Sequence, residues 1–312
     1  MQKQYLLITP CRDEADYIQN TVDSVSAQSV LPRKWIIVDD GSTDDTPALL
    51  AAASEQHSFI EVIRREDRGA RAVGPGVVDA FYAGLEAVDL SNYDYLCKLD
   101  GDLILPPKYF ELLMERFEAD PYLGSFSGKI YTLHEGTLIN EKLGNENAVG
   151  AAKFFRTQCF KDIGGFVRQT GWDGIDGHMC RLKGWITYSE DDPDMRITHL
   201  RMMGSTQKNI WTGRMRWGMG KYFMGSAPYY VFAVACYRML QKPLLIGGIG
   251  IFVGYLRAMI GGAPRMDNRD YLRHFRSYEL SSLLRGKGKT LERQNKAIRS
   301  NFSPPDERHF SS

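Results

Sequence analysis

Short apolar runs alternate with helix-spaced apolar positions along the first part of the chain. Runs at Tyr5–Thr9, Trp35–Val38 and Phe59–Ile63 predict buried strands. Between the first two runs, apolar residues recur at helical spacing from Ile18 to Val25. Strands and helices that alternate in this way predict a parallel sheet whose crossovers are right-handed.

A fourth apolar run, Tyr93–Leu99, ends on Asp100-Gly101-Asp102 and precedes a second amphipathic helix. The carboxyl ends of strands line the ligand crevice in an open parallel sheet, so two carboxylates are expected there. Carboxylate oxygens suit Mg²⁺ or Mn²⁺ that holds a phosphate. Taken alone, Asp-x-Asp is equally compatible with an ordinary solvated turn.

The second half departs from this alternation. Ser125–Leu133 and Ala148–Phe155 predict two strands, and the polar stretch His134–Asn147 between them is a candidate active-site loop. A helix is expected to begin near Asp173 and Asp176. Because these residues are three apart, both carboxylates can share one helix face.

Two apolar stretches near the C-terminus, Ala227–Leu240 and Leu244–Leu256, predict a helical hairpin. Each is shorter than the roughly 20 residues that a spanning helix needs. The pattern leaves three alternatives: helices that cover the core, a helix pair in a membrane surface, or spanning helices, which the Pro break and the glycines disfavour. Lys and Arg then outnumber Asp and Glu between Arg265 and Arg299, and a loosely ordered polar tail is expected from Gly286.

Composition narrows the class of protein. A chain of 312 residues can form one large or two small domains. A formal net charge of +1 argues against a nucleic-acid partner, because phosphate contacts need a concentrated basic excess. The 5 cysteines form no CxxC pair and fit a reducing compartment. The N-terminal apolar run is too short for a signal peptide, so the catalytic part is expected to face the cytoplasm.

Five sequence blocks occur in a specific order between Tyr5 and Ser205. In this order and spacing the chain resembles the inverting glycosyltransferases of family 2, which have the GT-A fold. The blocks are ITPCRDEADYIQNTVDSVSAQS, WIIVDDGSTDDT, LDGD, GGF followed by GWDGIDGHMCRLKGW, and THLRMMGS.

The resemblance implies an α/β fold of the GT-A type. We expect a Rossmann-like mixed, mostly parallel sheet flanked by helices, with a C-terminal helical extension that associates with a membrane. The expected parts are a glycosyltransferase domain over 1–225, with a nucleotide-binding half to about residue 103 and an acceptor half over 104–225, an apolar hairpin over 226–262, and a basic polar tail over 263–312.

The same resemblance implies a donor site at the ends of the first two strands. Asp39 and Asp40 match acids that accept hydrogen bonds from the base and ribose of a nucleotide sugar. Asp13 replaces the Asn that is usual in the first block. Arg68 and Arg71 fall where basic residues approach the donor diphosphate, and a solvated charged loop is the alternative. The implied donor-binding residues are Thr9, Pro10, Glu14, Asp39, Asp40, Ser42, Arg68, Arg71 and Asp100.

Asp100 and Asp102 match the metal motif of the family, and His199 lies where some relatives supply a further ligand. The implied cofactor is Mn²⁺ or Mg²⁺, whose charge offsets that of the departing nucleoside diphosphate. A structural histidine at a strand end is the alternative for His199.

The general base is implied to be Asp173, which has the family's spacing to Gly184-Trp185, although Trp172 replaces the usual Glu. Asp176, one turn later, stays open as an alternative base. The base removes the proton of an acceptor hydroxyl as that oxygen attacks the anomeric carbon, and one displacement inverts the configuration.

The sequence therefore predicts a metal-dependent hexosyltransferase that moves sugar from a nucleotide-diphosphate sugar to a glycan or lipid-linked acceptor. The expected location is the cytoplasmic face of the cell membrane. One alternative is a non-catalytic relative that binds nucleotide or glycan. The other is a sugar-phosphate nucleotidyltransferase, which would need a glycine-rich phosphate loop that Ile8–Asp13 lacks. The sugar, the nucleotide and the acceptor are not encoded in any recognisable motif.

Overall fold

The computed structural model describes residues 3–67, 69, 74–134, 136–141, 143–201, 210–241 and 244–303. The chain divides into two compact units. The first consists of residues 1–202 and 301–312, and the second of residues 203–300.

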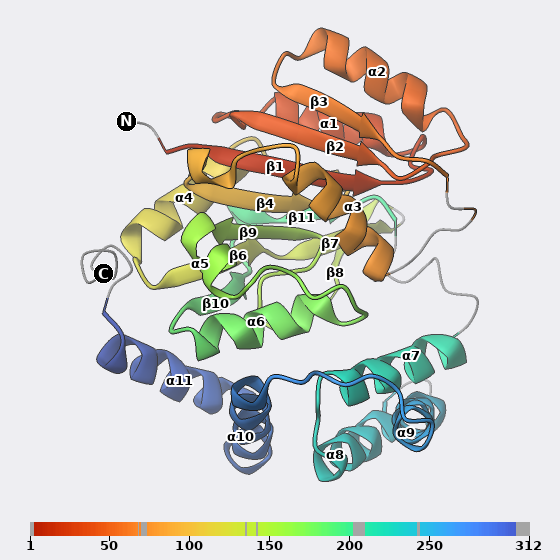
Figure 1. Ribbon diagram of the computed structural model, residues 1–312, viewed down its shortest axis with the longest axis vertical. Coiled ribbons are helices and arrows are strands. Elements are labelled where there is room, and N and C mark those ends of the chain that lie inside the picture. The colour runs from red at the N-terminus through yellow and green to blue at the C-terminus, as the bar shows by residue number, and fades with distance from the viewer. Residues whose placement is uncertain are drawn as a thin grey trace. The chain divides into compact units, whose positions relative to one another are not determined.

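A seven-stranded sheet forms the centre of the first unit, in the order β10-β6-β9-β4-β1-β2-β3 (Figure 1). Only β9 runs antiparallel to its neighbours, β4 and β6, and the other neighbouring strands pair in parallel. The mixed, mostly parallel sheet expected from the sequence is confirmed. The strands are β1 (Tyr5–Cys11), β2 (Lys34–Asp39), β3 (Ile60–Arg64), β4 (Tyr95–Leu99), β6 (Leu123–Gly128), β9 (Ala152–Arg156) and β10 (Ile186–Glu190).

Aromatic packing holds the helices of this unit to the sheet. The ring of Tyr5 stacks on Phe110, with 4.6 Å between centroids, and Phe154 contacts both Tyr95 and Phe117. These contacts join strands β1, β4 and β9 to α4. The helices are α1 (Ile18–Ser26), α2 (Thr46–Gln56), α3 (Pro75–Leu85), α4 (Tyr109–Ala119), α5 (Thr157–Asp162) and α6 (Trp172–Leu182), with short 3₁₀ turns at Leu90–Asn92 and Pro193–Met195.

A second, four-stranded sheet has the order β5-β11-β7-β8. The single strand predicted over Ser125–Leu133 is wrong, because β6 ends at Gly128 and β7 begins at Ile130 in the other sheet. A Cβ atom on Gly128 would lie 1.9 Å from the carbonyl oxygen of Met195, so a glycine permits this close approach. The strands are β5 (Leu103–Ile104), β7 (Ile130–His134), β8 (Thr137–Asn140) and β11 (Ile197–His199).

The second unit consists of helices. Two helices, α8 and α9, occupy the segment of the predicted hairpin, whereas the loosely ordered tail is wrong up to residue 301, because two further helices form there. The N–H of Tyr271 donates to the Asn268 side chain at 2.9 Å, which caps the first of them. The helices are α7 (Ile210–Phe223), α8 (Pro228–Met239), α9 (Ile246–Ile260), α10 (Arg269–Arg285) and α11 (Lys287–Asn301).

Glycines let α7 and α9 approach closely. A Cβ atom on Gly218 would lie 2.0 Å from the carbonyl oxygen of Ile251, and one on Gly254 would lie 2.1 Å from that of Met215. Among the described residues, no helix has both the length and the apolar character needed to cross a bilayer.

Candidate functional site

Two acidic side chains lie buried at the carboxyl end of β2. The Oδ1 atom of Asp39 accepts the N–H of Ser42 at 2.8 Å, and Asp40 accepts from Arg65 at 2.9 Å. Asp39 is 1% exposed, and no described residue donates a hydrogen bond to its Oδ2 atom. The Arg64 guanidinium lies 3.6 Å from that oxygen. A buried carboxylate oxygen without a donor is costly, so this atom is suited to a ligand N–H or O–H group.

The loop after β2 is held against a neighbouring segment. Gly41 has a φ of 77°, and a Cβ atom there would lie 2.5 Å from the Cα atom of Asp67. Arg12 donates to the Asp40 carbonyl at 3.0 Å and to the Asp67 carboxylate at 2.6 Å. These contacts fix the backbone that carries Asp39 and Asp40.

Arg201 joins two of the predicted site residues. Its Nη2 atom lies 2.8 Å from Glu14 and 2.7 Å from Asp102. Glu14 follows β1, Asp102 follows β4, and Arg201 follows β11, so one guanidinium ties three strand ends together.

His199 lies between two carboxylates. Its Nε2 atom is 3.3 Å from Asp102, and its Nδ1 atom is 3.0 Å from Glu141. Burial alone would lower the pKa of His199, but its hydrogen bonds to these two acids raise that pKa to about 9. In this arrangement the imidazole is a cation at neutral pH. Although burial opposes it, the bonds and charges of His199 and Arg201 lower the pKa of Asp102.

The predicted metal ligands can be compared with the needs of a divalent cation. Asp100 and Asp102 offer the carboxylate oxygens that Mg²⁺ and Mn²⁺ prefer, and the Asp100 side chain is 33% exposed. In the described parts of the chain, no group of three His, Cys, Asp or Glu side chains is arranged to hold a metal ion. Lys98 pairs with Asp100 and Arg201 with Asp102, so a metal would compete with these two cations.

Two lysines face each other across the centre of the sheet. Lys98 on β4 and Lys153 on β9 are register partners, and their side chains are 3% and 1% exposed. Both ammonium groups lie over the ring of Trp172, at 5.4 and 5.5 Å from its centroid. Each lysine is also neutralised by a predicted site residue, Asp100 for the first and Asp176 for the second.

The two candidate bases have different surroundings. Lys153 donates to the carboxylate of Asp176 at 2.5 and 2.6 Å and to the carbonyl oxygen of Asp173 at 2.6 Å. Asp176 is buried, whereas Asp173 is exposed at the start of α6. A Cβ atom on Gly150 would lie 3.1 Å from the Asp173 carboxylate. Asp176 therefore anchors the first turn of α6, and Asp173 is free to meet solvent or a ligand.

Of the remaining residues predicted to bind the donor, three lie in the described part of the chain. The Thr9 hydroxyl is buried and accepts from the Trp35 indole at 2.9 Å. Pro10 lies beside it on β1, and the Ser42 hydroxyl accepts the N–H of Asp13 at 2.9 Å. Arg68 and Arg71 lie outside the described residues.

Sequence reasoning missed four charged residues of this site: Lys98, Lys153, Glu141 and Arg201. A signal existed for the two lysines, because each interrupts an otherwise apolar strand, YLCKL and AKFFR. A lysine in such a strand is buried only with a partner.

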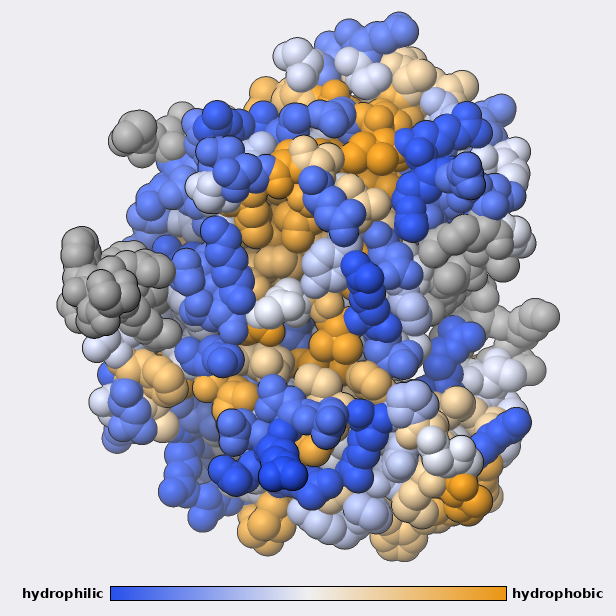
Figure 2. All heavy atoms as spheres, in the orientation of Figure 1, coloured by the Kyte–Doolittle hydropathy of each residue, from blue (hydrophilic) through white to orange (hydrophobic). Residues whose placement is uncertain are grey.

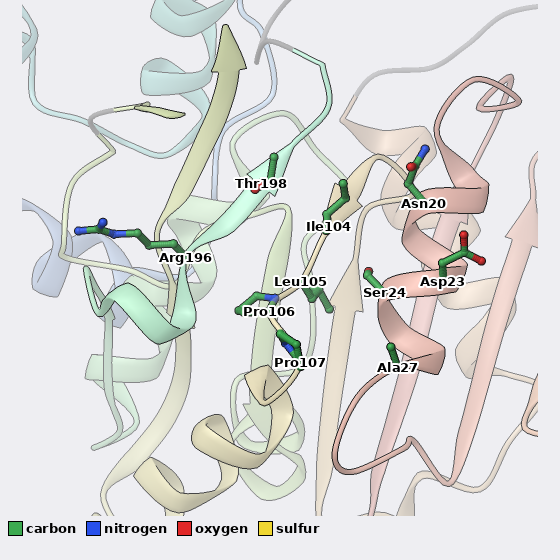
Figure 3. A pocket seen from close by; sticks show the side chains of 10 residues that line it. All are labelled: Asn20, Asp23, Ser24, Ala27, Ile104, Leu105, Pro106, Pro107, Arg196 and Thr198. Atoms are coloured by element: carbon green, nitrogen blue, oxygen red, sulfur yellow. The ribbon is translucent and has the colours of Figure 1, made fainter. Parts of the chain in front are cut away.

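A separate groove of about 570 Å³ lies along α1, the segment after β5, and β11 (Figure 3). Thr198 and Ile104, which line it, are cross-strand partners, as are His199 and Leu103. Because neighbours on a strand point to opposite faces, the groove lies on the other face of the small sheet from His199. None of the predicted site residues lines it.

The sequence model described as glycosyl transferase family 2 matches residues 6–179, which is more than half of the chain. The chain belongs to glycosyl transferase family 2. This match covers the ends of β1, β2 and β4, where site residues lie, but not the end of β11. The resemblance inferred from the five sequence blocks is therefore confirmed.

Curated relatives of this family 2 chain include a poly-beta-1,6-N-acetyl-D-glucosamine synthase of Staphylococcus aureus (strain MSSA476). It is 29% identical over 232 residues, which cover 67% of this chain and 52% of the relative. A synthase of the same description from Staphylococcus epidermidis is 24% identical over 230 residues, with the same two coverages. The chain thus spans about half the length of these relatives.

Solved structures share the fold. GalNAc-T7 with UDP, GalNAc and Mn2+ has a TM-score of 0.56 and 12% identity, over 90% of this chain and 58% of that one. Staphylococcus aureus TarS 1-349 in complex with UDP-GlcNAc has a TM-score of 0.52 and 12% identity, over 95% and 92%. These likenesses confirm the GT-A fold.

Proposed function

We propose that this family 2 protein is an inverting glycosyltransferase that uses a nucleotide-diphosphate sugar and a divalent metal. The acceptor is a hydroxyl of a glycan or of a lipid-linked saccharide. Support comes from the family match and from the glycan-synthase relatives, about half of whose length aligns with this chain.

The observation that carries the donor site is the buried Oδ2 atom of Asp39, to which no described residue donates. An N–H group of a nucleobase would satisfy it. Asp40 and Ser42 lie beside it on the loop that Gly41 and Arg12 hold in place. This loop would bind the nucleoside through its carboxylates, in the way that strand ends bind ligands in α/β folds.

Asp100 and Asp102 would hold the metal, and His199 would join them as a third ligand after losing the proton that its two acidic neighbours favour. A bound Mn²⁺ or Mg²⁺ would supply positive charge beside the diphosphate leaving group. Lys98 and Arg201 already keep cationic charge at these two acids. Once a metal takes over the two carboxylates, these cations would be left to attract a phosphate-bearing ligand near the end of β4.

Asp173 is the proposed base. Its exposed carboxylate can accept the proton of an acceptor hydroxyl, while the Lys153 bond to its carbonyl oxygen holds the first turn of α6. Asp176 is occupied by its buried pair with Lys153. The attack that Asp173 assists comes from the face of the sugar opposite the diphosphate, which inverts the anomeric carbon.

Membrane association is the last part of the proposal. The hairpin of α8 and α9 exposes large apolar side chains, and α10 and α11 are rich in Lys and Arg. An anionic leaflet attracts each nearby Lys or Arg by about 1 kcal/mol. We expect the protein to stay on washed membranes until detergent or high salt is added, and release by low-salt washing alone would count against this part.

Thermal stabilisation by a panel of nucleoside diphosphates, with and without Mn²⁺, tests the donor site. A ligand at 100 times its dissociation constant adds roughly 2.7 kcal/mol to the free energy of unfolding. One diphosphate is expected to stabilise the wild type only with metal, and Asp102→Ala should abolish the metal-dependent part. If a diphosphate binds but no sugar is transferred or hydrolysed, the protein is a non-catalytic relative; if none binds, the donor site is refuted.

A further inference from the structure

Two arginines in the second unit lie close together beside one tryptophan ring. Arg214 is on α7, and Arg238 is near the end of α8. Their guanidinium carbons lie 5.7 and 5.0 Å from the centroid of the same ring, that of Trp217. No carboxylate of the described residues forms an ion pair with either of them.

The stretch of sequence around this pair contains no acid. From Met195 to Met266 the chain contains no Asp or Glu, although Arg and Lys occur throughout this stretch. Like charges that lie close together in a partly buried place repel each other, and burial together with the charge of Arg214 lowers the pKa of Arg238. An anion at this place would remove the repulsion.

The start of α9 completes the arrangement. A Cβ atom on Gly247 would lie 3.8 Å from Nε of Arg214 and 3.6 Å from the carbonyl oxygen of Arg238. Gly247 is in the first turn of α9, where backbone N–H groups have no helical acceptor. Arg238 also donates to the Gln241 side chain at 2.7 Å, which orients its guanidinium. Guanidinium groups beside a helix start suit a phosphate oxygen.

The surroundings of the pair are apolar and open to solvent. Large side chains on α8, on α9 and at the start of α9 are exposed, and Figure 2 shows apolar residues over α9. Leu240 is 79% and Leu244 62% exposed. A soluble phosphate would leave these side chains in water, whereas a lipid covers them. The exposed apolar residues closest in sequence to Arg238 and Gly247 are Tyr237, Leu240, Leu244, Leu245, Ile246 and Ile249.

We propose that Arg214 and Arg238, at the start of α9, bind the phosphate of an anionic phospholipid while the exposed apolar side chains around them enter the leaflet. This inference deepens the membrane association proposed above and rests on it. It adds one localised phosphate site, whereas a general attraction between basic helices and the membrane would require no such site.

The test compares two double variants that remove the same charge. R214Q/R238Q removes the pair from α7 and α8, and R216Q/R257Q removes exposed arginines from α7 and α9 of the same unit. Binding of the full chain is measured by cosedimentation with phosphatidylcholine vesicles, with and without phosphatidylglycerol. The wild type should prefer the vesicles that contain phosphatidylglycerol.

The general field contributes roughly fivefold for each charge near the surface, so the control R216Q/R257Q is expected to lose at most about 25-fold. R214Q/R238Q should lose clearly more than the control, because it also removes the direct guanidinium bonds to the lipid phosphate. Equal losses in the two variants would overturn the localised site. Circular dichroism checks that both variants fold, and metal-dependent stabilisation by a nucleoside diphosphate, unchanged in both, keeps this result separate from the donor site.

Discussion

Lys153 makes the contacts that distinguish Asp173 from Asp176. Its ammonium group binds the carboxylate of Asp176 but only the backbone carbonyl oxygen of Asp173. The carboxylate oxygens of Asp173 are thereby left available, while the turn that carries them is held by a side chain with 1% exposure. A buried pair of this kind is costly to break, by about 3–5 kcal/mol when one partner is removed.

Substitution of each acid by Asn separates the two roles. Asp173→Asn is expected to lower kcat by about 10²–10⁴-fold, because the acceptor proton loses its base. Metal-dependent stabilisation by the nucleoside diphosphate should stay as in the wild type. Initial rates of sugar transfer and thermal shifts, measured for the variant and the wild type, check both expectations. A D173N enzyme with wild-type kcat would remove Asp173 from the proposal.

The pH dependence of stability should report on Asp176. Burial, only partly offset by Lys153, raises the pKa of this carboxyl to about 6 in the folded protein. Between the ordinary pKa of an aspartate and that value, the folded state binds more protons than the unfolded state, so the free energy of unfolding falls as pH rises. Relative to Asp176→Asn, the wild type should lose on the order of 2 kcal/mol from pH 4 to 6 and little more above pH 6.

Urea unfolding of the wild type and Asp176→Asn across this pH range measures the difference. The Asn variant lacks the titrating group but keeps the shape of the side chain, so it is the matched control. A difference that does not change with pH would mean that Lys153 keeps Asp176 ionised throughout.

At the scale of elements, apolar periodicity predicted those strands and helices whose burial is decided by neighbours in the sequence. The helix that begins at Ile18 and the strands before Asp40 and Asp100 are examples. The boundary at Gly128 was missed because a distant residue, Met195, determines it. Arg201 was missed for the same reason, since its partner Glu14 is 187 positions away.

The resemblance named the acids of the site, and their assigned roles remain predictions. It could not supply the cations that neutralise them. Lysines that occur inside apolar strands were a visible signal, whereas Glu141 belongs to a polar stretch in which nothing distinguishes it from its neighbours. The polar loop predicted there also contains a strand, β8, whose side chains are mostly exposed and so leave no apolar alternation to detect.

The α7–α9 contact offers a matched pair of glycine substitutions on one helix. Gly254→Ala places a methyl group against the Met215 carbonyl and is expected to destabilise the second unit by about 1–3 kcal/mol. In Gly247→Ala, the new carbon would lie 3.6 Å from the nearest atom of another helix, the carbonyl oxygen of Arg238. Because alanine favours helix more than glycine, this control should stabilise by up to about 1 kcal/mol. Chemical denaturation of both variants checks the difference, and equal effects would contradict the packing described for α9.

The whole molecule is expected to unfold in two steps, because it consists of two compact units with separate cores. In calorimetry, the nucleoside diphosphate with Mn²⁺ should raise the transition of the unit that contains Asp39 and Asp102. Gly254→Ala should lower the other transition. A single transition that both perturbations shift equally would show that the two units unfold together.

The antiparallel strand β9 has a consequence for how the protein is made. Strand β4 pairs with β1 on one side, but its other side stays uncovered until residues 152–156 have left the ribosome. A nascent chain that ends before β9 therefore presents an apolar strand with a free row of backbone donors and acceptors, which is a template for aggregation. Lys98, in the middle of that strand, places a charge on the exposed edge during this interval. The residue that later faces Lys153 beside α6 is therefore expected to discourage the unfinished sheet from pairing with other chains.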